Sequence, residues 1–124
     1  MQENHDNHPL DLSYLKEMVG HNPEFMIEVF DTFIEQTPFY LAELEDALSS
    51  ENWDKVGNCA HKIKPTFSYV GRSDVKDFVQ SIEDNARNQI AVEQIPADVE
   101  RLKALLVEIY AQLEVAKKDI QSNL

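Results

Sequence analysis

Residues 26 to 48 carry a stripe at helical spacing, and this stripe limits the chain to a helical fold more than any other feature. It consists of Met26, Phe30, Phe33, Thr37, Leu41, Leu44 and Leu48, separated by 4, 3, 4, 4, 3 and 4 positions. All but Thr37 are apolar, and the spacing follows the 3.6-residue period of an amphipathic helix. The stripe passes Pro38 without losing phase, so we predict one long helix over residues 22–49, kinked at Pro38. Two helices that meet at Pro38 are the alternative.

Similar stripes predict three further long helices and a short first one. The expected ranges are residues 11–19, 53–70, 73–87 and 96 or 97 to 120, with Gly71 ending the second of them. The predicted fold class is therefore all-α, an antiparallel four-helix bundle with a short additional N-terminal helix. We expect residues 1–9 to form a flexible N-terminal tail and residues 10–124 a single domain. A bundle of this kind has no pocket by default.

His61 lies off the apolar stripe of its predicted helix. That stripe comprises Val56, Cys59, Ile63, Phe67 and Val70, and Cys59 is predicted to be a buried structural thiol. With about 100° between successive residues, another face lies within roughly 60° of His61 and is small or polar. It holds Gly57, His61, Lys64, Pro65 and Ser68. We therefore predict that His61 and Lys64 are exposed, with Lys62 about 100° around the helix.

The charge of the chain narrows the classes of partner. A formal net charge of −12 disfavours nucleic acid and anionic membranes, because both attract basic patches. The local charge of residues 52–72 is different, because this segment contains only one acid, Asp54. Its cations are Lys55, Lys62, Lys64 and Arg72. Chance clustering on a solvated face explains such a stretch. The alternative interpretation, which we favour, is that an anionic group such as a phosphoryl group is held beside His61.

Targeting signals are not apparent in the sequence. No apolar run approaches the roughly 18 residues of a membrane span, and residues 1–9 lack the basic and apolar regions of a signal peptide. The cytoplasm is therefore the expected location. A monomer is expected, because one bundle accounts for the predicted apolar faces.

The segment AHKIKPTFSYVG, residues 60–71, resembles the signature of histidine-containing phosphotransfer (HPt) domains. Ala60, His61, Ile63, Lys64, Ser68 and Gly71 match that signature, and the order of the predicted helices is also similar to the family. Pro65 departs from it, because the family usually has glycine there. Proline removes the amide that would bond the carbonyl of His61. We predict a bend beside His61 in a helix that continues past it.

The resemblance implies a phosphocarrier of a two-component phosphorelay rather than an autonomous ATP-dependent kinase. In that family the imidazole Nε2 exchanges a phosphoryl group with an aspartate of a receiver domain, which is the expected partner. The receiver brings Mg²⁺, so the chain is expected to need no cofactor or metal of its own. His61 would be the phosphoacceptor, and Lys64 would neutralise the charge of the phosphoryl group. The docking residues would be Gly57, Lys62, Pro65 and Ser68.

A second function stays open. Because Pro65 departs from the family pattern, the chain is alternatively a degenerate HPt domain, a non-catalytic helical adaptor that binds a receiver or kinase domain through the same face. Walker and kinase Gly-rich motifs are absent from the sequence.

The remaining histidines and the phenylalanines receive structural interpretations. A metal site at His5, Asp6 and His8 is disfavoured because these residues belong to the expected tail. His21, in a turn before a predicted helix, is expected to be structural or inert. Five phenylalanines are predicted to lie in the core: Phe25, Phe30, Phe33, Phe67 and Phe78.

Overall fold

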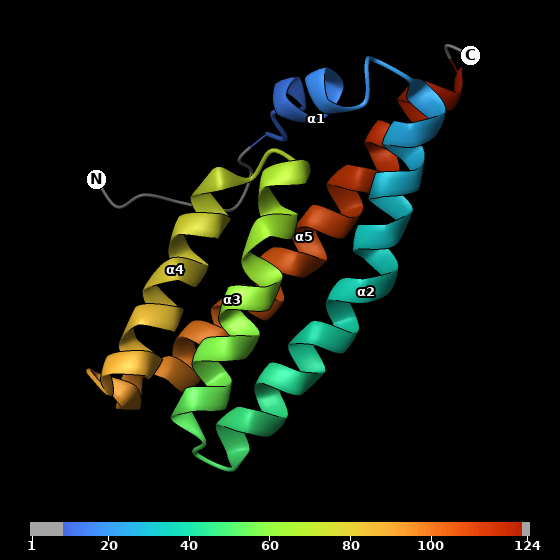
Figure 1. Ribbon diagram of the computed structural model, residues 1–124. Coiled ribbons are helices and arrows are strands. Elements are labelled where there is room, and N and C mark those ends of the chain that lie inside the picture. Colours follow the sequence, from blue (N-terminus) through green and yellow to red (C-terminus); the bar gives the residue numbers. More distant parts are fainter. Residues whose placement is uncertain (1–8, 123–124) are drawn as a thin grey trace, which may run out of the picture.

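The predicted all-helical architecture is confirmed by a computed structural model, which describes residues 9–122 (Figure 1). The elements are α1 (Ser13–Met18), α2 (Pro23–Ser49), α3 (Trp53–Tyr69), α4 (Ser73–Asn88), the 3₁₀ helix η1 (Val92–Gln94) and α5 (Ile95–Ser122). No strand occurs within these residues. The predicted tail and the residues His5, Asp6 and His8 lie outside the described part of the chain, apart from Pro9. The domain boundary at residue 10 stays a prediction.

The four long helices form the bundle. Helix α3 packs against α2 and α4, and α5 packs against the same two helices. Short turns join α2 to α3 and α3 to α4, so these neighbours run antiparallel. Figure 1 shows the short α1 lying across the end of the bundle where α2 begins and α3 ends. The chain thus places α3, with its signature segment, between two neighbours and leaves its outer face open.

Helix α2 is continuous through Pro38, as its stripe predicts. It begins at Pro23, and the side chain of Asn22 caps it by accepting hydrogen bonds from the amides of Glu24 and Phe25. The one polar residue of the stripe, Thr37, is fully buried. Its hydroxyl donates to the carbonyl of Phe33 at 2.7 Å and lies 2.6 Å from the hydroxyl of Tyr110 on α5. Burial of Thr37 therefore leaves its hydroxyl paired.

The core is formed by the predicted stripes, with one error among the aromatic residues. Phe30, Phe33 and Phe67 are buried, and Phe33 makes an edge-to-face contact with Phe67. Cys59 is buried and free, as predicted. Phe25 is 54% exposed, so its assignment to the core is wrong. It stands in the first turn of α2, one position before the buried stripe residue Met26, and so lies off the buried face of the helix.

The turn from α3 to α4 contains Gly71, which ends α3 as predicted. Its φ of +71° lies in the left-handed region, and a Cβ here would stand 1.8 Å from the carbonyl oxygen of Asp11. The amide of Asp11 donates to the carbonyl of Gly71 at 3.0 Å. Glycine thus allows the segment before α1 to lie directly on this turn.

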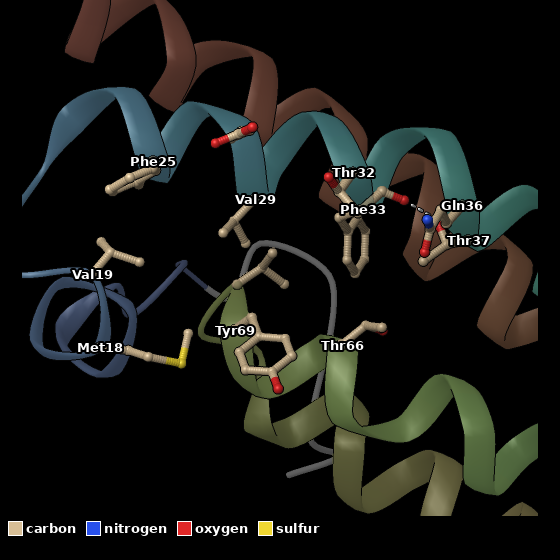
Figure 2. A pocket seen from close by; sticks show the side chains of 12 residues that line it. Met18, Val19, Phe25, Val29, Thr32, Phe33, Gln36, Thr37, Thr66 and Tyr69 are labelled. Atoms are coloured by element: carbon tan, nitrogen blue, oxygen red, sulfur yellow. Dashed lines mark hydrogen bonds between the residues drawn. The ribbon is translucent and has the colours of Figure 1, made fainter.

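A pocket contradicts the expectation that the bundle has none. A cavity of about 470 Å³ opens between α1, α2 and α3. In Figure 2, Val29 and Phe33 reach it from α2, Thr66 and Tyr69 from α3, and Met18 from α1. The cavity arises because α1 covers the end of the bundle only in part.

The search for membrane spans gives a negative result. Among residues 9–122, every helix is either too short or too polar to cross a bilayer.

Candidate functional site

His61 projects from the middle of α3 into solvent. Its side chain is 64% exposed, as the sequence predicts, although Ile63 beside it is buried. One side of the imidazole is tethered, because Nδ1 lies 3.2 Å from Oε2 of Glu83 on α4. The predicted continuation of α3 past Pro65 is confirmed, since the helix runs on to Tyr69.

Glu83 is the residue of this site that the sequence analysis missed. It is only 6% exposed, yet it meets three nitrogen-bearing side chains. Its Oε1 accepts from Nζ of Lys64 at 2.9 Å, and its Oε2 accepts from Nε of Arg87 at 3.0 Å. The available signal was an acid four residues after the buried Val79, on the apolar stripe of α4. A buried carboxylate in such a position requires charged partners.

The pKa of Glu83 reflects these partners. Burial acts to raise it. Hydrogen bonds from Lys64 and Arg87, with the charges of Lys64 and His61, outweigh burial and hold the pKa below its ordinary value of 4.5. An ionised carboxylate only accepts hydrogen bonds, so Nδ1 of His61 must carry the proton that joins the pair. In the neutral form of the imidazole, the free lone pair therefore lies on Nε2.

The lowered pKa predicts an acid-dependent loss of stability. The folded state holds the Glu83 proton more weakly than the unfolded chain, so the stabilisation is complete above about pH 4.5 and is lost as the pH falls through the lowered pKa. We expect the excess stability of the wild type over Glu83→Gln, measured by urea unfolding, to shrink as the pH falls below about 4.5. A difference that stays constant over this range would contradict the assignment.

Lys64 is less exposed than predicted. Its side chain is 14% exposed, because Nζ lies between Glu83 and Oε1 of Gln80. The structure therefore brings Lys64 and His61 together through a shared carboxylate rather than side by side in solvent. Lys62, which is 53% exposed, turns toward α2, where it lies 3.5 Å from Glu43 and 5.0 Å from the centre of the Tyr40 ring.

Gly57 is not part of the exposed face, which corrects its predicted position. It is buried beneath the side chain of Arg87, and a Cβ at position 57 would stand 2.8 Å from Cγ of that arginine. Pro65 is exposed as expected. Ser68 is half-buried and lines a hollow of about 390 Å³ near Tyr14, away from the imidazole.

The cationic stretch is largely neutralised by acids from other segments. Arg72 is fully buried, and its Nε lies 3.0 Å from Oδ1 of Asp74. Lys64 pairs with Glu83, and Lys62 with Glu43. The local excess of positive charge in the sequence is therefore smaller on the surface of the folded chain. Within residues 9–122, no three His, Cys, Asp or Glu side chains gather in a way that could hold a metal ion.

These features define a class of protein: a four-helix bundle that presents one tethered imidazole on an open helix face. The family model of the Hpt domain matches residues 28–115, and the chain belongs to the Hpt domain family.

Solved structures give a similar fold. The crystal structure of histidine-containing phosphotransfer protein B (HptB) from Pseudomonas aeruginosa PAO1 superimposes with a TM-score of 0.81 at 18% identity. The match covers 91% of this chain and 97% of that chain. A comparison with curated proteins finds no significant match.

Proposed function

We propose that this chain is a phosphocarrier of a two-component phosphorelay, in which His61 exchanges a phosphoryl group with an aspartate of a receiver domain. The observation that carries the proposal is the contact between Nδ1 of His61 and the ionised Glu83. This contact directs the lone pair of Nε2 away from α4 and toward solvent, where a partner can approach. We propose a cytoplasmic monomer that acts on receiver domains of response regulators or hybrid kinases.

The transfer step follows from the tautomer. The lone pair of Nε2 attacks the phosphorus of the receiver's aspartyl phosphate, the N–P bond forms, and the P–O bond breaks with its electron pair leaving on the aspartate carboxylate. Nδ1 keeps its proton, so the imidazole ring becomes cationic. The carboxylate of Glu83 then faces that cation at Nδ1 and stabilises it. No general base is needed.

In this scheme the ammonium group of Lys64 neutralises negative charge on the phosphoryl group. It stands one turn after His61, and its ammonium already lies beside the same carboxylate that holds the imidazole. Neutralising the phosphoryl oxygens is the main demand of this chemistry. Mg²⁺ would come with the receiver domain. Lys62 and Pro65, the exposed neighbours of His61, are proposed to contact the receiver domain.

Phosphoryl acceptance tests this proposal. The purified chain is incubated with each phosphorylated receiver of the source organism, and the protein-bound phosphate is tested for stability. We expect label on the chain that is labile in acid and stable in alkali, as a phosphoramidate is. Absence of label from every receiver, with binding to one of them retained, would instead favour the adaptor function.

Lys64→Ala is expected to affect both transfer and stability. Loss of a charge-assisted hydrogen bond should slow transfer by roughly tenfold or more and lower the free energy of unfolding by about 1–2 kcal/mol. Stopped-flow transfer and urea unfolding measure the two effects. Lys55→Ala is the matched control, because Lys55 is an exposed cation on the same helix. Equal slowing by both variants would contradict the role of Lys64.

A further inference from the structure

Arg87 occupies a place that no part of the proposed transfer step yet uses. Its side chain crosses α3 over Gly57 and turns back so that Nε donates to Oε2 of Glu83 at 3.0 Å. The same oxygen lies 3.2 Å from Nδ1 of His61. The two nitrogens bond to one atom, so they lie no more than about 6 Å apart. Arg87 is therefore a neighbour of the imidazole contributed by α4.

The direction of the side chains places Arg87 on the side of His61 opposite Lys64. Helical side chains incline toward the N-terminus of their helix, so His61 leans toward the turn that contains Gly57. Arg87 covers that turn, whereas Lys64 stands one turn beyond His61 in the other direction. A group on the imidazole would thus have a cation on each side. The Arg87 side chain is 43% exposed, and its hydrogen bond to Glu83 uses only Nε.

We propose that Arg87 is a second cationic ligand of the phosphoryl group on His61, held by Glu83 until the group arrives; this inference rests on the proposed function. Before transfer, the carboxylate of Glu83 is shared by Lys64, Arg87 and the imidazole of His61. Transfer makes the ring cationic while Nδ1 keeps its proton. The carboxylate then has a full positive charge at Nδ1, and Arg87 can turn its terminal nitrogens to the phosphoryl oxygens by side-chain rotation alone.

Gly57 has a defined part in this arrangement. Any side chain at position 57 would displace Arg87, because the added Cβ would meet its Cγ at 2.8 Å. Because Gly57 has no side chain, the Arg87 side chain can pack directly on the backbone of α3 at this position. This role replaces the docking role that the family resemblance implied for Gly57.

The test compares equilibrium constants for phosphoryl exchange between the chain and one receiver. This constant depends only on the free proteins, so contacts made within the docked complex do not alter it. We expect Arg87→Ala to lower the equilibrium constant for phosphorylation of the chain about tenfold, as loss of a hydrogen bond to a charged group implies. Arg101→Ala removes the same charge on α5, which packs against α2 and α4, and serves as the control.

A second background separates a phosphoryl contact from a positioning role. If Arg87 binds the phosphoryl group, its replacement by alanine lowers the constant at least as much in a Glu83→Gln background as in the wild type. If Arg87 acts only by holding Glu83, its replacement has no effect in that background, and the inference is overturned. If the wild type is not phosphorylated on His61, the proposed function itself fails. If the wild type is phosphorylated and Arg87→Ala has no effect on the constant, only the inference about Arg87 fails.

Gly57→Ala displaces the arginine without removing its charge. We expect Gly57→Ala to lower the equilibrium constant for exchange in the wild-type background. In the Arg87→Ala background it should have no further effect, because the added methyl group then has room. Asn58→Ala, on an exposed position of the same helix, is the control. If Gly57→Ala still lowered the constant in the Arg87→Ala background, Gly57 would not act by providing space for Arg87.

Discussion

His61→Gln is expected to abolish phosphoryl acceptance while leaving the bundle folded. Glutamine has no nucleophilic nitrogen, because its amide lone pair is delocalised into the carbonyl, so no N–P bond can form. The side chain of His61 is 64% exposed, and its hydrogen bond is to Glu83. Stability should therefore change by less than about 1 kcal/mol. Phosphate labelling and urea unfolding measure the two properties on the same preparation.

The control for this variant is the other histidine that the structure describes. His21 lies in the turn between α1 and α2 with a φ of +59°, so His21→Asn keeps a residue type that tolerates this conformation. We expect His21→Asn to accept phosphate at the wild-type rate. Undiminished labelling of His61→Gln would place the phosphoacceptor elsewhere in the chain.

Arg72→Ala is expected to produce the largest loss of stability. The guanidinium is fully buried and forms a fork with Asp74, with Nε to Oδ1 and Nη2 to Oδ2 both at 3.0 Å. Nη1 donates to Gln112 on α5 at 3.0 Å. Alanine leaves a cavity and removes the guanidinium charge that faces the Asp74 carboxylate at the start of α4, at a cost of about 3–5 kcal/mol. Urea unfolding measures this loss.

Arg72→Lys separates charge from geometry. Lysine keeps the positive charge but lacks the planar fork that meets Asp74 with two nitrogens. We expect it to recover only part of the stability lost in Arg72→Ala. A loss below about 1 kcal/mol in Arg72→Ala would show that the buried arginine contributes little net stability.

Local periodicity was enough to predict the helices. The stripe through Pro38 predicted one continuous α2, and Gly71 marked the end of α3, because both signals depend on residues that are near in sequence. His61 was found for the same reason, since its position relative to the stripe of its own helix decides its exposure.

Contacts between helices could not be predicted from local periodicity. Glu83 and Arg87 stand on α4, and their approach to His61 depends on the rotation and axial register of α4 against α3. Neither quantity is encoded in the period of one helix. Lys64 and Gly57 were misplaced for this reason, because partners on α4 cover both. The cavity beside α1 likewise depends on how a six-residue helix lies across the bundle.

The site of the N–P bond tests the central claim most directly. The chain is labelled with ¹⁵N in its histidines, phosphorylated by a receiver, and examined by NMR for coupling between phosphorus and each imidazole nitrogen. We predict that Nε2 of His61 carries the phosphorus while Nδ1, facing Glu83, keeps its proton. Phosphorus on Nδ1, or on no nitrogen of His61, would contradict the account.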